Sequence, residues 1–159
     1  MGPQVPQAVL DYLGSQKTVT LATATLDGRP HASTFMYVND GLLIYFWARP
    51  TSTTAQQIQA NPRVSFAIDE YVADWNKAKG IQGYGEGQLV SDGEEVGKAV
   101  GLFADRFTSP SSGASTTNIT FFRINPQQLQ FIDNEGQRVS FGGDEFGMDF
   151  HREQVLSDG

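Results

Sequence analysis

The sequence predicts a mainly β domain with a few helices, in which six or more strands close into a barrel. Segments rich in Val, Thr, Tyr and Phe recur at short intervals along the 159 residues, and 17 glycines supply tight turns between them. Strands joined by such short turns would leave long exposed edges unless the sheet closes. We expect one domain, residues 1–159, with a loosely ordered Gly- and Asp-rich tail at 142–159.

The N-terminal part begins with a helix over residues 6–13, because Pro6 suits the first helical position and apolar residues recur on one face. Asp27-Gly28 and Asn39-Asp40-Gly41 are turn signals between extended segments. Three strands are therefore expected at 18–25, 31–38 and 42–48. The last of these is apolar on both faces, which predicts burial on both.

Two further helices are bounded by capping residues. One starts at Thr51, Ser52 or Thr53 and ends at Asn61-Pro62. The other starts at Asp92, with Glu95 at the reciprocal position of a capping box. Its predicted inward stripe consists of Val96, Val100, Phe103 and Phe107.

The remaining strands are expected at 63–71, 80–91, 119–124, 128–133 and 138–141. The strand at 80–91 carries glycines at positions 80, 83, 85 and 87. This pattern indicates bulges, sharp curvature or the close approach of another group.

Composition excludes several classes of function. The net charge of −7 argues against a nucleic-acid partner, because little basic surface is available to replace counterions. The absence of Cys excludes disulfides, thiolate catalysis and Cys-ligated metals. No apolar stretch is long enough for a membrane span, and the N-terminus lacks the pattern of a signal peptide. We therefore expect a cytoplasmic protein that does not bind membranes.

No catalytic residue can be named from the sequence. The two histidines are His31, which follows a turn proline, and His151 in the tail, and neither has the partners of a hydrolytic triad. Acidic residues gather between Asp144 and Glu153, but their spacing fits no metal-ligand set. We expect no metal site.

A phosphate site is a candidate at Arg49-Pro-Thr-Ser-Thr-Thr, directly before a helix. Free N–H groups at a helix N-terminus bind anions, and hydroxyls add donors. Plain N-capping is the alternative. The preceding run Tyr45-Phe46-Trp47 offers an apolar edge for a flat ring, with core packing as its alternative.

An ordered set of short motifs resembles one family. Leu21-Ala22-Thr23 is followed by Asp27-Gly28-Arg29-Pro30, by Leu42 to Phe46, by Asn61-Pro62-Arg63-Val64-Ser65, and by Gln82 to Gly87. Together they resemble the pyridoxamine 5′-phosphate oxidase-like, FMN-binding split-barrel superfamily. The resemblance implies a closed six-stranded split β-barrel and a homodimer with two flavins at its interface, each contacting both chains.

The resemblance also implies where FMN would bind. Its phosphate would lie by the second strand and the start of the following helix. The implied cofactor-binding residues are Ser33, Thr34, Phe35, Met36, Trp47, Ala48, Arg49, Ser52, Thr53, Thr54 and Gln82. Many relatives carry Arg where Ser33 stands and Arg-Lys where Thr53-Thr54 stand, so hydroxyls replace bases here. Arg49 and Arg63 remain as cations that could compensate.

The implied function is an FMN-dependent oxidoreductase acting on an unknown small molecule, with chemistry carried by the cofactor. One alternative is a non-catalytic protein that binds flavin, haem or a deazaflavin such as F420. Another is a dimeric relative without a cofactor, which the missing basic residues favour.

Overall fold

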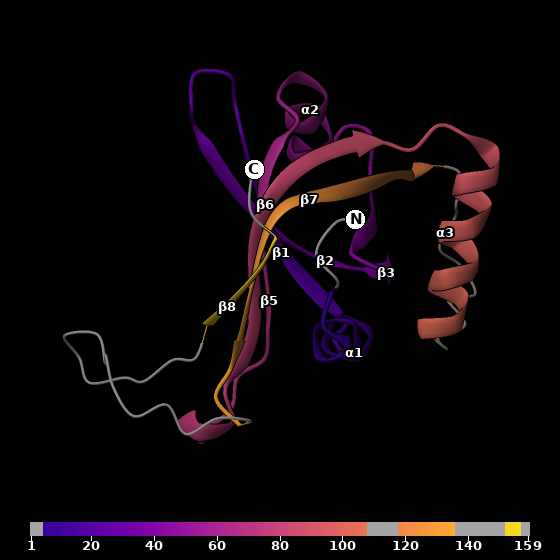
Figure 1. Ribbon diagram of the computed structural model, residues 1–159. Helices are drawn as coiled ribbons and strands as arrows, with labels where there is room; N and C mark the ends of the chain where they lie inside the picture. The colour runs from indigo at the N-terminus through magenta and orange to yellow at the C-terminus, as the bar shows by residue number, and fades with distance from the viewer. Residues whose placement is uncertain (1–4, 108–117, 136–151, 157–159) are drawn as a thin grey trace.

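The computed structural model describes residues 5–107, 118–135 and 152–156, the last segment by its backbone alone. A curled antiparallel sheet forms most of the molecule, and three α-helices lie around it (Figure 1). The helices are α1 (Gln7–Ser15), α2 (Thr53–Ala60) and α3 (Gly93–Arg106), with a 3-10 turn, η1, at Trp75–Lys77. The strands are β1 (Thr18–Ala24), β2 (Pro30–Met36), β3 (Val38–Asp40), β4 (Leu43–Ala48), β5 (Arg63–Asp69), β6 (Lys79–Leu89), β7 (Thr120–Asp133) and β8 (Arg152–Leu156).

The sheet has eight strands, in the order β2-β1-β5-β6-β7-β4-β3, with β8 paired to β7. This differs from the expected closed, six-stranded barrel, because among the described strands no ladder joins the two ends of the path. Those ends, β2 and β3, are consecutive in the chain and flank Tyr37. The predicted strand at 31–38 breaks at Tyr37. Its N–H bonds to Lys17, and its buried hydroxyl donates a 2.6 Å hydrogen bond to the Leu13 carbonyl.

Two glycines of β6, Gly83 and Gly85, are explained by the close approach of β7 and, at Gly83, of Phe66 on β5. A Cβ at Gly83 would lie 2.6 Å from Cζ of Phe66 and would overlap the Gln128 carbonyl. A Cβ at Gly85 would lie 2.9 Å from Cα of Pro126. The register shifts between Tyr84 and Gly85, opposite Pro126. This bulge lets β7 continue as one strand, where the sequence predicts two.

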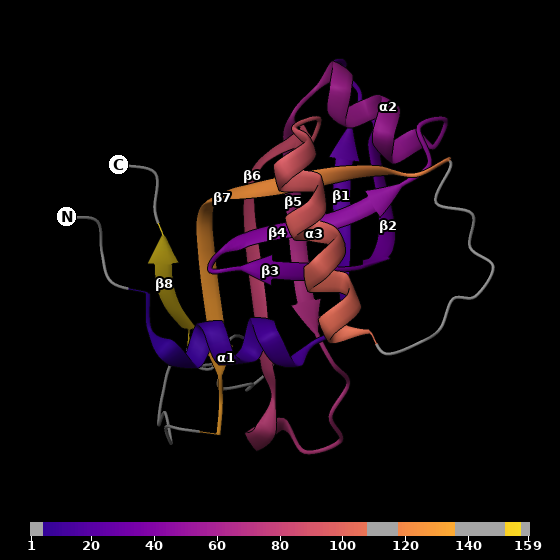
Figure 2. The same cartoon turned by 90° about the vertical axis from the view of Figure 1, so that its right-hand side faces the viewer.

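Two apolar cores lie on opposite faces of the curled sheet. The first fills its concave side and includes Leu21, Phe46 and Ile124. The second lies beneath α3 and includes Val38, Tyr45 and Phe121 (Figure 2). The inward stripe of α3 was predicted wrongly at one position, because Val100 is 50% exposed and Ala99 is the buried residue.

The C-terminal part is described only at β8, which pairs with β7. Residues 152–156 thus form a strand within the tail expected to be loosely ordered. The remainder of that tail and the predicted strand at 138–141 lie outside the described residues. None of the helices in the described chain has the length and apolar character needed to cross a membrane.

Candidate functional site

The start of α2 has the geometry of an anion-binding helix terminus. Ser52 is the N-cap, and its hydroxyl accepts a 3.1 Å hydrogen bond from the N–H of Ala55. The Ser52 carbonyl accepts the N–H of Gln56. The N–H groups of Thr53 and Thr54 have no hydrogen-bond partner among the described residues. Two backbone donors therefore remain at this terminus, where the helix dipole favours negative charge.

Side-chain hydrogen bonds fix α2 to β1, and Figure 2 shows the helix above the ends of β1 and β2. Thr23 on β1 donates a 2.7 Å hydrogen bond to Oε1 of Gln57. Further along, Nδ2 of Asn61 donates to the carbonyl of Ala24 at 3.3 Å. The C-terminal half of α2 thus lies over the end of β1, while its N-terminus follows directly from β4.

The predicted residues of β2 divide between two faces. Ser33 and Phe35 are partly buried and face the sheet interior, where the ring of Phe35 lies 4.8 Å from that of Phe46. Thr34 and Met36 are exposed on the outer face. The alternation of a strand accounts for this division, so a cofactor can contact the side chains of only one pair at a time.

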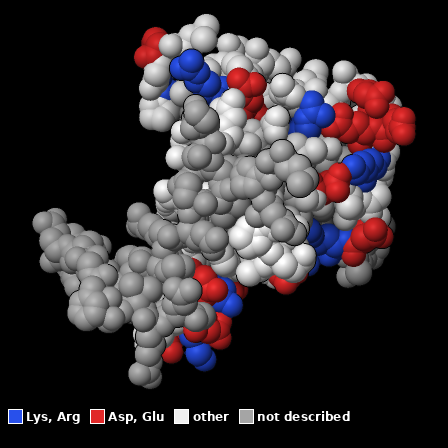
Figure 3. All heavy atoms as spheres, in the orientation of Figure 1, with Lys and Arg blue, Asp and Glu red and all other residues white. Residues whose placement is uncertain are grey.

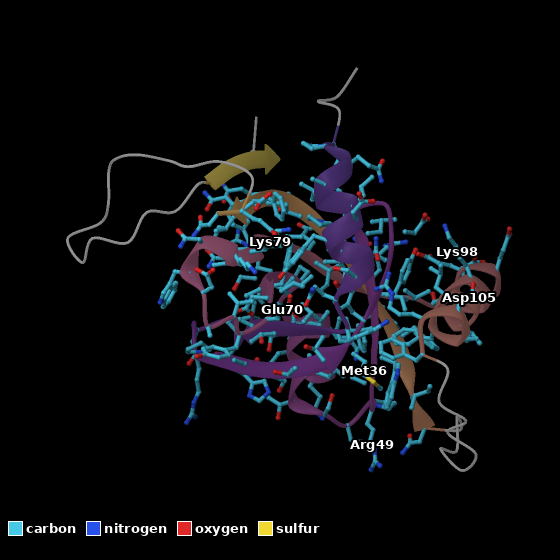
Figure 4. The ribbon with its side chains drawn as sticks, turned by 90° about the horizontal axis from the view of Figure 1, so that it is seen from below. Met36, Arg49, Glu70, Lys79, Lys98 and Asp105 are labelled. Carbon is cyan, nitrogen blue, oxygen red and sulfur yellow. The ribbon has the colours of Figure 1, made fainter. Side chains whose placement is uncertain are left out.

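The predicted residues at the end of β4 are likewise divided between the two faces of the sheet. Ala48 is buried in the first core, and Trp47 packs into the second core beside Phe121. Arg49 is exposed, and Figure 4 shows its side chain extending away from the protein body. Its carbonyl accepts the N–H of Ser52 at 2.9 Å, which places the Arg49 backbone one turn before α2.

Gln82 is separated from the β2 residues within one chain. The strand registers place Thr34, Thr20, Ala67 and Gln82 in one row across four neighbouring strands. Three strand spacings correspond to about 14 Å. Gln82 is exposed in a groove of about 340 Å³ that Tyr71 and Trp75 also line. The sequence-predicted residues therefore form two groups rather than one continuous pocket.

A larger groove, of about 650 Å³, lies over β1, β5 and β6. Its floor carries small side chains, including Ala22 and Ser65, and Tyr84 lines it as an exposed aromatic residue. Arg63 and Glu86 are a cross-strand pair in the same groove. Small side chains, an exposed aromatic ring and a pair of opposite charges suit contact with a ring or with another protein surface.

Charged groups do not identify a catalytic centre. On the face that Figure 3 shows, Lys and Arg are interspersed with Asp and Glu. In the described part of the chain, no group of three His, Asp or Glu side chains could hold a metal ion. Burial raises the pKa of Tyr37 and is the main cause that raises the pKa of Tyr12 to about 12, but both residues belong to the first core.

The structure adds His31 to the candidate residues. Its Nε2 lies 2.9 Å from Oγ of Ser33, and both side chains are on the inner face of β2. The i, i+2 spacing on a predicted strand was the available signal in the sequence. As a catalytic base His31 has no triad partner, so the sequence did not point to this pair.

The curled antiparallel sheet, with α2 following β4, defines a split-barrel class of β protein. The sequence profile described as pyridoxamine 5′-phosphate oxidase matches residues 5–133. The chain therefore belongs to the pyridoxamine 5′-phosphate oxidase-like, split-barrel superfamily, which confirms the resemblance seen in the sequence.

The individual proteins that are similar to this chain share only 20–24% sequence identity with it. General stress protein 26 of Bacillus subtilis is 24% identical over 135 residues, which cover 85% of this chain and 92% of that protein. The heme storage protein HutZ from Vibrio cholerae has a similar fold, with a TM-score of 0.67, 20% identity, and coverage of 79% of this chain and 93% of HutZ. A conserved hypothetical protein from Mycobacterium tuberculosis gives a TM-score of 0.72 at 22% identity, covering 90% of this chain and 96% of that protein.

Proposed function

We propose that the chain is a homodimeric FMN-binding protein that acts as a flavin-dependent oxidoreductase on a small molecule. The observation that carries this proposal is the family match, which spans β1 to β7 and includes every predicted site residue. The α2 terminus supports it, because Thr53 and Thr54 offer free N–H donors to a phosphate. Bound FMN would supply the electron or hydride transfer.

The proposed homodimer accounts for the separation between the two groups of site residues. Thr34 and Gln82 lie about 14 Å apart in one chain. A second copy against the outer sheet face would place its own residues over the groove of about 650 Å³. In this arrangement the chain's residues bind and orient the flavin and exclude water from its ring.

Haem binding is the second candidate. The similarity in fold to HutZ, described as a heme storage protein, favours it. Haem iron generally takes an axial side-chain ligand, and His31 is the histidine among the described residues. Its Nε2 is engaged by Ser33, so haem iron would be ligated through Nδ1 or would displace the Ser33 hydroxyl.

The test is the visible absorption spectrum of the purified protein, followed by parallel titrations with FMN and hemin. A flavin spectrum, or uptake of FMN at submicromolar concentration, would support the proposal, and reduction of the bound flavin by a nicotinamide donor would then be assayed. A Soret band with no flavin uptake would favour haem. If the protein binds neither FMN nor hemin, the remaining candidates are a deazaflavin-binding protein and a dimer without a cofactor.

A further inference from the structure

Gly80 is a glycine of β6 that strand packing does not require. A Cβ at this position would lie 3.4 Å from Cβ of Asp69 and 3.5 Å from the carbonyl oxygen of Ile68, which are ordinary contacts. By contrast, Gly83 and Gly85 could not carry a Cβ without overlap. Gly80 lines the groove of about 340 Å³ and lies opposite Asp69 in the β5–β6 ladder. The missing side chain therefore keeps the groove open beside Asp69.

Two exposed aromatic side chains line the same groove. Tyr71, which follows β5, is 92% exposed, and Trp75, at the start of η1, is 60% exposed. The turn that carries Trp75 is fixed through its backbone, because Asp74 accepts the N–H of Asn76 at 3.0 Å and Nδ2 of Asn134 donates to the Trp75 carbonyl at 3.1 Å. Aromatic rings beside a groove are typical of ligand sites, and their faces attract cations.

The charge at this groove is negative. Asp69 and Glu70 line it and are exposed, and neither forms an ion pair within the described part of the chain. Lys79 is the cation among the described lining residues, and its ammonium forms a 2.8 Å ion pair with Glu135. Three carboxylates therefore stand against one ammonium, and the net charge of the chain, −7, has the same sign. This potential attracts a cation and repels an anion.

We propose that this groove binds a small organic cation, with its charge against Asp69 and Glu70 and its apolar part against the ring of Tyr71. The volume of about 340 Å³ is in the range of small-molecule sites. Aromatic rings recognise quaternary ammonium and related cations through the negative face of the ring, and carboxylates add to this attraction. A neutral ring compound would gain the apolar contact alone.

Gln82 connects the groove with the proposed function. It lines the groove and is the β6 residue expected to reach the flavin. Two residues further along β6, Tyr84 lines the larger groove that the proposed dimer would cover. A cation bound here would lie beside the cofactor ring, so the substrate of the proposed oxidoreductase belongs to the class of organic cations. This substrate class rests on the proposed function, whereas the binding of the cation does not.

The test compares ring compounds of opposite charge. Phenyltrimethylammonium, a cation, and benzenesulfonate, an anion of similar size, are each titrated into the full chain and followed by calorimetry and by backbone amide NMR signals. The cation should bind in the millimolar range or more tightly, should shift the signals of Asp69, Glu70 and Tyr71, and should lose affinity as salt is added. Benzenesulfonate should bind about tenfold more weakly or not at all.

Three variants and a control locate the binding site. Asp69→Asn and Tyr71→Ala should each weaken binding of the cation by about threefold to tenfold, whereas Tyr71→Phe, which keeps the ring, should bind it normally. Both positions are exposed, so the variants should fold. Asp105→Asn removes an exposed carboxylate of α3, which Figure 4 shows well apart from Glu70, and should change nothing.

The outcomes separate the groove from the proposed function. Equal affinity for the two probes, or unchanged affinity in both Asp69→Asn and Tyr71→Ala, would reject the cation site. In the FMN-loaded protein the cation should perturb the flavin absorption spectrum, and its absence of effect would reject the substrate class while the cofactor proposal stands. Cation binding by a protein that takes up no FMN would overturn the proposed function and the substrate class, and the groove would remain a cation site.

Discussion

The hydroxyl of Tyr45 on β4 donates a 2.9 Å hydrogen bond to Oε1 of Glu95 on α3. The same carboxylate forms an ion pair with Arg123 of β7. Asp92 caps α3 by accepting the N–H of Glu95, as the sequence predicts. The Glu95 side chain is used differently from a capping box, because it fastens the first turn of α3 to the sheet.

Removing this contact should loosen α3 without altering the first core. Tyr45→Phe and Glu95→Gln should each lower the free energy of unfolding by about 1–3 kcal/mol, since a hydrogen bond to a charged group is lost near a buried ring. Urea denaturation of both single variants and the double variant gives the coupling energy. A coupling energy near zero would show that the two side chains act independently.

Substitution by alanine should be tolerated much less well at a glycine of β6 than at a glycine of α3. Gly85→Ala should cost about 3 kcal/mol or prevent folding, because the new methyl group would overlap the β7 backbone. Gly97→Ala is the control, since nothing lies within 4 Å of a Cβ at that position in α3. It should stabilise the protein by about 0.5–1 kcal/mol. Thermal melts of the two variants test both statements, and a neutral Gly85→Ala would contradict the packing described.

Stability should decrease at high pH. Burial, aided by the charges of Glu70 and Asp69, raises the pKa of Tyr12 to about 12, and burial also raises the pKa of Tyr37 and Tyr45. Because these phenols ionise more easily in the unfolded chain, the stabilisation is complete below about pH 10 and is lost as the pH rises toward 12. Phenolate absorbance should therefore rise together with loss of the circular dichroism signal. The urea-unfolded protein, measured over the same pH range, provides the reference.

The proposed dimer should depend on the outer face of the sheet. Ser65 is exposed in the groove between β1 and β6, so Ser65→Glu would bury a charge at an interface formed there. Sedimentation at micromolar concentration should give about twice the chain mass for the unaltered protein and a shift toward monomer for this variant. Ala104→Glu, on the exposed face of α3, should remain dimeric. If the unaltered protein were a monomer, a cofactor site formed by two chains would be excluded.

Arg49 is an exposed cation close to the α2 terminus, and we expect it to attract the cofactor phosphate. Arg49→Ala should weaken FMN binding by about tenfold, with a smaller effect at high salt because the contact is exposed. Arg63→Ala, measured in parallel, reports the contribution of the cation in the larger groove. Unchanged affinity in the first variant would exclude Arg49 from the site.

The helix caps could be predicted from the sequence because their signals are local, whereas the predicted cofactor contacts stay a prediction. Ser52 and Asp92 cap their helices as expected, since a capping hydroxyl or carboxylate acts within three residues. The position of Trp47 could not be predicted in this way. An aromatic residue at the end of a strand suits either a ring site or a core, and only the packing of α3 places it in the second core.

The sequence by itself determined the family, the order of the elements and the turn and capping residues, because these depend on neighbours in the chain. Tertiary structure decided the break at Tyr37, the continuity of β7 through its bulge, and the eight-stranded open path of the sheet. It also decided that His31 lies across the β1–β2 ladder from Thr23, the residue that α2 contacts. These features depend on which strands pair and on which face each side chain points, and such long-range contacts leave no local signature in a single sequence.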